Sequence, residues 1–478
     1  MINLEIIGRK RQIEQLQECL EEDSAQLVVV YGRRRVGKTY LINNFFKNKF
    51  SFKLTGAYKQ NKATQLRNFK LAYEDATSTT IDCPKDWIEA FELLRKYLLN
   101  TKSDEKQVVF IDEMPWLDSY RSGFLPAFEW FWNDFGCTQN NLIFIVCGSA
   151  TSWMVDNIDK NKGGLFNRYT CRIYLEPFSL METKQYLDSK GFMWSNYEIV
   201  ECYMALGGIP FYLSLLKKKL SLSLNIDSLF FERKAVLADE FNNLYATLFS
   251  NSENYIKVVE ALGTKRSGMT KSEICQKTKL PTNGSTTKII DNLIDSGFIR
   301  AQLFYGNKKK DAKYQLADYY TAFYLHFVKD NYGNDENYWS HSIDNPSRRV
   351  WEGLTFEQVC KDHIKQIKQA LGISGVLTKQ SVWNCKDNDE KGITGAQIDL
   401  LIERRDKVIN LCEIKFSNNE YIIDKNYDLA LRNKVSSFVK STGTKSSIQL
   451  TMITTYGVKK NIYSSLITNQ VTLDDLFK

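Results

Sequence analysis

The chain of 478 residues has 43% hydrophobic and 13% aromatic side chains, which excludes a disordered protein and leaves room for about three domains. No apolar run approaches the ~18 residues needed to span a membrane, and the N-terminus lacks a secretory signal pattern. We therefore expect a soluble, cytoplasmic protein without a membrane partner. The net charge of +8 indicates an anionic partner only if the basic residues are concentrated in one region.

Cysteine and histidine argue against a metal site built from sulfur or imidazole. Ten cysteines lie singly between Cys19 and Cys412 without a CxxC pair, as is typical of reduced thiols packed in cores. None of the three histidines is spaced as a helical ligand pair. Any metal is therefore expected to be held by oxygen.

The first chemical motif follows residues 26–31, QLVVVY, an apolar run typical of a strand buried in a parallel sheet. Residues 32–39 read GRRRVGKT, the GxxxxGK[ST] pattern of a phosphate-binding loop. Its glycines let backbone amides turn toward phosphate, and the next helix adds the positive end of its dipole. Lys38 would neutralise the β- and γ-phosphates, and Thr39 would bind Mg²⁺. The predicted site for ATP and Mg²⁺ comprises Gly32, Arg33, Arg34, Arg35, Val36, Gly37, Lys38, Thr39 and Tyr40.

Two later strands would complete this site. Residues 107–113 read QVVFIDE, in which Asp112 would hold Mg²⁺ through water and Glu113 would orient and deprotonate the attacking water. The apolar run 141–147 ends at Gly148 and Ser149, and the Ser149 hydroxyl could reach the γ-phosphate or the water. A plain Gly-Ser turn is the alternative. Between these strands, aromatic residues at helical spacing in 124–135 predict core packing.

These segments, with IIGRKRQIEQL near the N-terminus, GLFNRYTCRIYLEPFS at 164–179 and GGIPFYL at 207–213, resemble the AAA+-related predicted ATPases of prokaryotes. Within that group they look most like the STAND-type branch and its archaeal-type ATPase family, over most of the chain. The resemblance implies that Gly8 and Arg9 lie near adenine, although Lys10 stands where an acidic residue often follows.

The same resemblance assigns two further positions. Arg168 would be a phosphate-sensing or finger arginine, although Asn167 replaces the usual glycine and an exposed basic residue is the alternative. Pro210 would belong to the GGxP signature of a helical lid that transmits the nucleotide state to the rest of the chain. Without the resemblance, this segment would indicate only a loop between helices.

Three short helical segments and two strands in 254–317 predict a winged helix-turn-helix, with a capping box that begins at Thr270. Between Lys265 and Lys313, eleven basic residues stand against four acidic ones, so charge is concentrated here. Lys288 and the wing lysines 308–310 could contact DNA phosphates, and residues 285–287 could reach backbone or bases. A module used only for protein contacts or as a spacer is the alternative.

The last segment carries a second set of charged residues. A helix with Glu357, a strand with Asp399, a short turn and a strand with Glu413 and Lys415 bring charges together, because the last two share one face of their strand. The pattern resembles the PD-(D/E)XK nucleases, although the proline is absent. It implies that Asp399, Glu413 and the optional Glu357 hold a divalent metal and that Lys415 positions water. A salt bridge on a hairpin is the alternative.

We therefore predict an α/β protein with several modules. They are a P-loop AAA+-like core with a parallel sheet (1–180), a helical lid (181–250), a winged helix-turn-helix (251–330) and an α/β restriction-endonuclease-like domain (345–478). The first functional hypothesis is an ATPase that acts on double-stranded DNA and cycles between ATP and ADP, in mobile-element or defence biology by resemblance. The rival is a nucleotide-switched regulator or scaffold without nuclease activity, and a weaker one is an ATPase that acts on proteins. The sequence leaves a homo-oligomer open.

Overall fold

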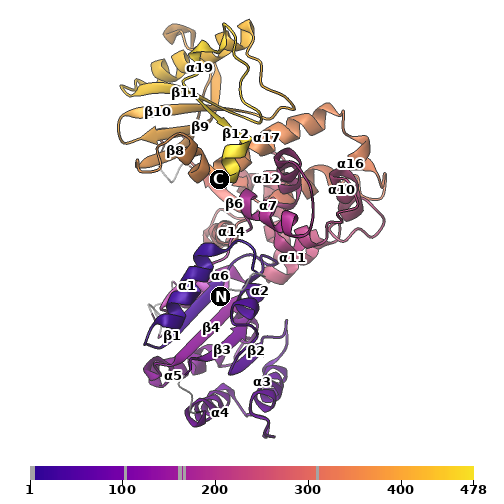
Figure 1. Ribbon diagram of the computed structural model, residues 1–478, viewed down its shortest axis with the longest axis vertical. Coiled ribbons are helices and arrows are strands. Elements are labelled where there is room, and N and C mark those ends of the chain that lie inside the picture. The colour runs from indigo at the N-terminus through magenta and orange to yellow at the C-terminus, as the bar shows by residue number, and fades with distance from the viewer. Residues whose placement is uncertain (1–5, 102–104, 160–163, 165–167, 308–311) are drawn as a thin grey trace. The chain divides into compact units, whose positions relative to one another are not determined.

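Five parallel strands form the sheet of the N-terminal unit, which comprises residues 1–177, 209–211 and 247–250 (Figure 1). The computed structural model describes the chain except for residues 1–5, 102–104, 160–163, 165–167 and 308–311. The strand order is β2-β3-β4-β1-β5, so β1 pairs with both β4 and β5. The strands are β1 (Gln26–Tyr31), β2 (Phe52–Thr55), β3 (Gln107–Asp112), β4 (Leu142–Gly148) and β5 (Cys171–Tyr174).

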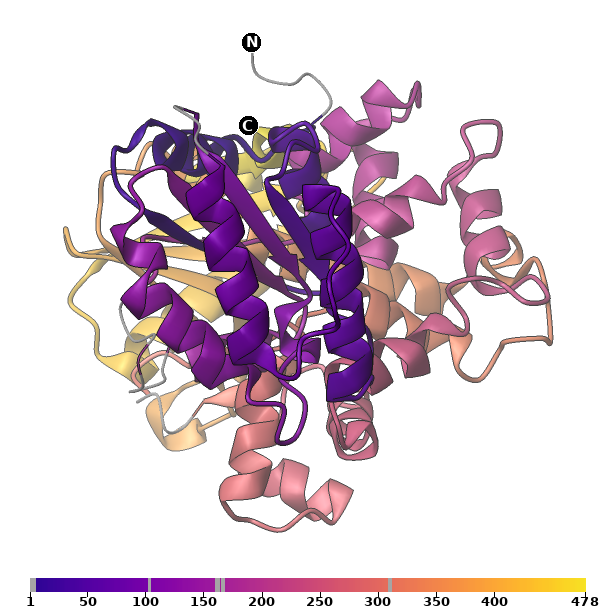
Figure 2. The same cartoon turned by 90° about the horizontal axis from the view of Figure 1, so that it is seen from below.

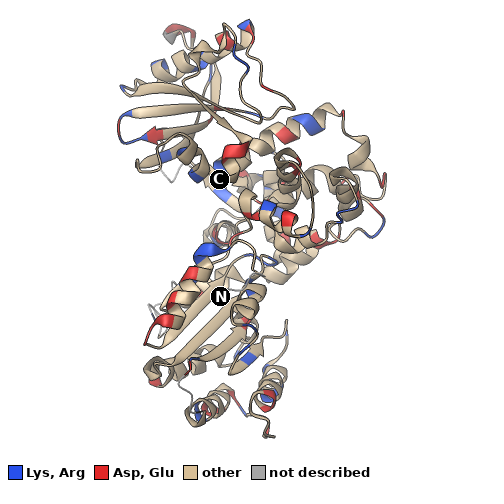
Figure 3. Cartoon of the chain, in the orientation of Figure 1, with Lys and Arg blue, Asp and Glu red and all other residues tan. Residues whose placement is uncertain are grey.

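The core of the N-terminal unit is built from apolar strands and from helices rich in aromatic residues. Strands β1, β3 and β4 are buried along their whole length, and Figure 3 shows them almost free of charge. One face of the sheet packs against three helices in a shared core, which includes Phe69, Phe91, Phe128 and Phe144. The core packing predicted for the aromatic residues of 124–135 is confirmed. The helices, which can be followed in Figures 1 and 2, are α1 (Lys10–Glu21), α2 (Lys38–Phe45), α3 (Lys62–Thr77), α4 (Trp87–Asn100), α5 (Phe124–Asp134) and α6 (Thr151–Met154).

The C-terminal unit comprises residues 178–208, 212–246 and 251–478. Its first part is helical, and capping boxes at Ser179 and Ser195 begin two of the helices. Two further helices, α9 (Pro210–Ser214) and α11 (Glu240–Leu248), have residues in both units. The helices of the first part are α7 (Leu180–Ser189), α8 (Asn196–Leu206) and α10 (Leu222–Phe230).

Three helices and an antiparallel ribbon follow, in the order predicted for a winged helix. Thr270 and Glu273 form the predicted capping box. One expectation changes: Thr286 was predicted to reach DNA, but its side chain is fully buried and its hydroxyl donates to the Pro281 carbonyl. The wing lysines 308–310 lie outside the described residues. The elements are α12 (Ser252–Gly263), α13 (Lys271–Thr278), α14 (Gly284–Asp295), β6 (Ile299–Gln302) and β7 (Lys313–Leu316).

A second five-stranded sheet, of order β12-β11-β10-β9-β8, completes the C-terminal unit. The predicted antiparallel pairing of the Asp399 and Glu413 strands is confirmed. None of the described helices is long and apolar enough to cross a membrane. The remaining elements are α15 (Tyr319–Phe323), α16 (Tyr338–His341), α17 (Pro346–Asp362), α18 (Ile364–Ala370), β8 (Thr378–Cys385), β9 (Ala396–Arg404), β10 (Val408–Lys415), α19 (Lys425–Thr442), β11 (Ser447–Thr454) and β12 (Asn469–Thr472).

Candidate functional site

The predicted phosphate loop connects β1 to α2 in a conformation that requires glycine at its start. Gly32 has φ +146°, and a Cβ atom there would lie 2.3 Å from the carbonyl oxygen of Leu175. Gly37, with φ +91°, caps α2 without any side-chain hydrogen bond to the first amides of that helix. A Cβ atom on Gly37 would meet no described atom within 4 Å. The loop therefore presents uncapped helix amides to an open space, as a phosphate site requires.

Lys38 lies within the loop that it is predicted to serve. Its side chain is 5% exposed, and its ammonium group donates to the carbonyls of Gly32 at 3.0 Å and Arg33 at 2.9 Å. These bonds fix the positive charge beside the loop amides. The charge is thus positioned where a triphosphate would bind.

Thr39 and Asp112, the two residues predicted to bind Mg²⁺, lie in direct contact. The Thr39 hydroxyl donates to Asp112 Oδ2 at 2.8 Å, although the two residues come from α2 and β3. Burial raises the pKa of Asp112, and the hydrogen bond from Thr39 opposes that shift. Among the described residues, no Lys or Arg forms an ion pair with this carboxylate. A hydroxyl and an uncompensated carboxylate fit Mg²⁺, which prefers oxygen ligands.

Glu113 is held by the neighbouring strand. It follows β3 in the left-handed region, with φ +49°. Its carboxylate accepts hydrogen bonds from the Ser149 hydroxyl and from the Ser149 amide, the latter at 3.1 Å. Ser149 therefore orients the predicted general base, a contact that the motif alone did not reveal. The signal for it is that β3 and β4 are parallel neighbours, so their carboxyl ends adjoin.

The loop arginines contact protein groups. Arg34 donates to the Thr247 hydroxyl at 2.7 Å, and the Arg35 guanidinium lies 4.0 Å from the centre of the Phe211 ring. Phe211 follows Pro210, so the predicted GGxP segment does reach the phosphate loop. No sequence signal pointed to Thr247, whereas Phe211 belongs to the segment GGIPFYL that the sequence analysis singled out.

Arg9 and Arg168, two residues singled out by the family resemblance, lie in different surroundings. Arg9, next to Gly8, is 6% exposed and donates to the carbonyls of Val36 at 3.1 Å and Glu176 at 2.8 Å. Its guanidinium therefore links Val36 of the phosphate loop to Glu176, which follows β5. Arg168 is exposed and follows residues outside the described part of the chain, and no described contact joins it to the loop. The other predicted loop residues divide by exposure: Arg33 and Val36 are buried, and Tyr40 is exposed.

The predicted residues of the C-terminal unit also cluster, around a buried glutamate. Glu413 is 3% exposed, and its carboxylate accepts from the Tyr427 hydroxyl at 2.6 Å. The ammonium groups of Lys415 and Lys434 lie 3.1 and 2.7 Å from its two oxygens. Burial acts to raise the pKa of Glu413, but the two lysines outweigh it and the pKa is lowered. Lys434 and Tyr427, both from α19, were not identified from the sequence.

Asp399 sits at a β-bulge. Between the pairs Ser381–Leu401 and Trp383–Ile398, strand β9 has one residue more than β8. The Asp399 carboxylate accepts from Gln397 at 3.0 Å, and its pKa is raised by burial and by the charge of Glu413. Burial and the charge of Asp399 raise the pKa of Glu357 to about 7. The three carboxylates are therefore close enough to influence one another.

This cluster does not fit a divalent metal in the arrangement that the structure shows. In the described part of the chain, no three His, Cys, Asp or Glu residues are grouped as metal ligands. Glu413, the predicted central ligand, is already neutralised by two ammonium groups. The predicted metal role of Asp399, Glu413 and Glu357 thus stays a prediction that the observed geometry does not favour.

Known proteins match the N-terminal half most clearly. Residues 6–216 match the family described as an ATPase domain predominantly from Archaea. An uncharacterized protein of Methanocaldococcus jannaschii is 25% identical over 419 residues, which is 86% of this chain and 88% of that protein. An uncharacterized ATP-binding protein of the same organism is 49% identical over 43 residues, 9% of this chain and 73% of that protein.

Two solved structures align over much of the chain. The Walker-type ATPase PABY2304 of Pyrococcus abyssi has a TM-score of 0.48 and 18% identity, with 67% of this chain and 96% of that chain covered. The ORC2 protein of Aeropyrum pernix has a TM-score of 0.42 and 13% identity, with coverage of 69% and 95%. The family match at residues 6–216 includes the phosphate loop, Asp112 and Ser149, whose geometry is described above.

Proposed function

We propose that the chain binds ATP with Mg²⁺ at residues 32–39, hydrolyses it, and uses the nucleotide state to regulate DNA binding by its C-terminal unit. The observation that supports hydrolysis is the pairing of two contacts from different strands. Thr39 contacts Asp112, and Ser149 contacts Glu113, at the same edge of the sheet. A nucleotide-binding loop alone would not need the second contact.

Each group has a defined part in the reaction. The α2 amides and Lys38 bind the β- and γ-phosphates. Thr39 would hold Mg²⁺ directly and Asp112 through water, and the ion would supply positive charge beside the phosphate oxygens. Glu113, oriented by Ser149, takes the proton of the attacking water. Phe211, which contacts Arg35 and follows Pro210, connects this loop to α8 through the chain.

The DNA-binding part rests on charge. The segment from Lys265 to Lys313 carries eleven basic and four acidic residues, close to the excess of the whole chain. Lys288 on α14 is exposed. We favour binding without cleavage over a nuclease, because Lys434 and Lys415 neutralise Glu413 where a metal-dependent nuclease needs a carboxylate for its ion.

The ATPase rate with and without duplex DNA tests this proposal, for the native chain and for Lys38→Ala. We expect ATP turnover in the native chain and a change in its rate when duplex DNA is added. In Lys38→Ala the ATPase rate should fall at least about 100-fold, because the ammonium group that binds the transferred phosphate is removed. Absence of turnover in the native chain under all conditions contradicts hydrolysis. A DNA affinity that does not fall as salt rises contradicts phosphate contacts and favours a protein target.

Plasmid DNA incubated with Mg²⁺ or Mn²⁺ and ATP decides between regulation and cleavage. We expect retention of the plasmid without strand breaks. Cleavage that is lost in both Asp399→Ala and Lys415→Ala contradicts the regulatory proposal and establishes the nuclease.

A further inference from the structure

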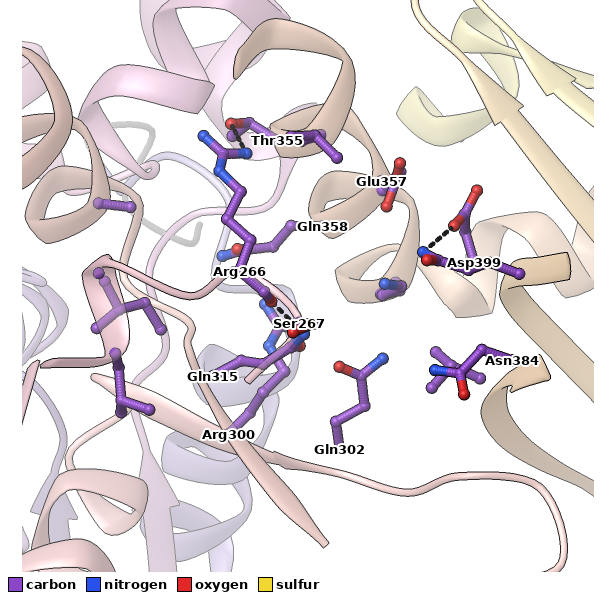
Figure 4. A pocket seen from close by; sticks show the side chains of 18 of the residues that line it. Arg266, Ser267, Arg300, Gln302, Gln315, Thr355, Glu357, Gln358, Asn384 and Asp399 are labelled. Carbon is purple, nitrogen blue, oxygen red and sulfur yellow. Dashed lines mark hydrogen bonds between the residues drawn. The ribbon is translucent and has the colours of Figure 1, made fainter. Parts of the chain in front are cut away.

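A cavity of about 290 Å³ lies within the C-terminal unit, between the β6–β7 ribbon and the C-terminal sheet (Figure 4). Its lining includes Arg266, Gln302 and Gln315 on the ribbon side and Asn384, Gln397 and Asp399 on the sheet side. Its volume is close to the lower limit of small-molecule sites, about 300–1,000 Å³. A molecule of modest size therefore fits, and a duplex does not.

The walls of this cavity are bonded to each other. The segment after β6 continues onto β8, where Tyr305 donates its amide to the Val382 carbonyl at 2.8 Å. On the other side, the Arg300 guanidinium forms two hydrogen bonds with the Asp362 carboxylate, at 2.6 and 3.2 Å. Gln358 donates to the Ala317 carbonyl at 2.6 Å. The cavity is thus a fixed part of the fold.

Polar groups of the lining lack protein partners. The Gln302 Oε1 atom is buried, and no hydrogen-bond donor among the described residues reaches it. A buried acceptor without a partner costs about 1–3 kcal/mol, so an occupant that donates to it would recover free energy. The Arg266 guanidinium contacts the Thr355 hydroxyl at 3.5 Å, and no described carboxylate pairs with it within 4 Å. In Figure 4 the Gln302 amide points toward the open centre, and the Arg266 guanidinium lies beside Thr355 at the edge of the cavity.

These groups match the chemistry of a nucleotide. A guanidinium without a carboxylate partner binds phosphate oxygens. Amide side chains pair with the edges of bases, to which they both donate and accept. A base enters a pocket of this size only when it is outside a stacked duplex. We propose that this cavity binds one unpaired nucleotide unit, with its phosphate on Arg266 and its base edge on Gln302 and Asn384.

The inference rests on the DNA-binding part of the proposed function and specifies its substrate class. The nucleotide unit comes either from an unpaired strand end or from a free mononucleotide. If the inference holds, the predicted winged-helix segment forms one wall of the nucleotide site, in addition to the DNA-phosphate contacts predicted for its wing.

The test measures fluorescence anisotropy of the full chain with two labelled DNA hairpins, one blunt and one with an unpaired thymine extension, in EDTA and without ATP. We expect tighter binding of the extended hairpin by about tenfold. Arg266→Gln should weaken that binding about tenfold, and Gln302→Leu about fivefold, because a charged and a neutral hydrogen bond are lost. Gln369→Leu, an exposed amide on α18, is the matched control and should bind as the native chain.

The Gln302→Leu variant also separates a ligand contact from a structural role. Since the Gln302 acceptor has no protein partner, its replacement should leave Tm unchanged or raise it while binding falls. Equal binding of the two hairpins together with no binding of thymidine monophosphate, or native affinity in Gln302→Leu, overturns the inference and shows that the cavity holds water only. A fall in Tm of Gln302→Leu with equal weakening for the blunt hairpin overturns it as well.

Competition with thymidine monophosphate identifies the source of the nucleotide. Displacement of the extended hairpin by the monophosphate supports a free mononucleotide, and resistance to displacement supports a strand end. If neither hairpin binds but calorimetry shows monophosphate binding that Gln302→Leu loses, the DNA part of the proposed function fails and the cavity inference stands.

Discussion

Two carboxylate pairs, Asp112–Glu113 in the N-terminal unit and Asp399–Glu413 in the C-terminal unit, differ in how their charge is neutralised. Asp112 has a hydroxyl partner and, within the described chain, no ionic one. Glu413 has two ammonium groups and a phenol. The first pair leaves a charge for a cation from solution. In the second pair, Glu413 is already neutralised by the protein, so the same residue types on strands do not imply the same chemistry.

A third case lies between them. Glu201 on α8 and Glu352 on α17 share one guanidinium, that of Arg348, at 3.5 and 2.8 Å. One cation for two buried carboxylates is too little, and burial and the charge of Glu352 raise the pKa of Glu201 to about 7. The number of internal cations therefore decides whether a buried carboxylate pair binds metal, takes up a proton or stays ionised.

The largest effect on activity is expected at the Asp112–Glu113 pair, for which the protein supplies no cation. Glu113→Gln should lower kcat for ATP hydrolysis by about 1,000-fold, because the base that accepts the proton of water is lost. Nucleotide affinity should change little, since Lys38 and Thr39 remain. Steady-state kinetics and nucleotide titration measure the two quantities. Glu14→Gln, an exposed change on α1, serves as the control, and a kcat near native for Glu113→Gln would exclude this residue as the base.

Removing Lys434 should leave the Asp399–Glu413 pair with a net negative charge that a metal ion can neutralise, as expected for the Asp112–Glu113 pair. Lys434→Met is expected to cost about 3 kcal/mol, at the low end for a broken buried ion pair because Lys415 and Tyr427 remain. Mn²⁺ should then raise the Tm of Lys434→Met and leave the native Tm unchanged in the absence of nucleotide. Lys425→Met, an exposed lysine at the start of α19, is the control. Stabilisation of the native chain by Mn²⁺ would show that the lysines do not block the metal.

The intermediate pair predicts a pH dependence. The raised pKa of Glu201 means that the unfolded state ionises first, so stability falls as pH rises from about 4.5 to about 7. Glu201→Gln should therefore be more stable than the native chain by about 3 kcal/mol above pH ~7, and nearly equal to it around pH ~4.5. Calorimetric Tm values over this range measure the difference. The exposed change Glu420→Gln should show none, and a parallel pH profile for Glu201→Gln would contradict the explanation.

Local sequence patterns were sufficient for the elements that carry the motifs. The apolar run before Gly32 and the one before Asp112 gave two strands of one parallel sheet, because buried strands need continuous apolar residues. The capping box at Thr270 and the hairpin between Asp399 and Glu413 were equally local. The roles assigned to these residues remain predictions.

Tertiary structure decided which groups stand beside those motifs. Lys434 reaches Glu413 only because α19 packs on the sheet, and Ser149 reaches Glu113 only because β4 is inserted next to β3. The cavity beside Gln302 depends on the ribbon meeting β8. The charge balance at a site and its exclusion of solvent depend on neighbouring residues that come from distant parts of the chain. A motif fixes its own backbone and side chains, whereas the electrostatic environment that selects their chemistry is set by packing.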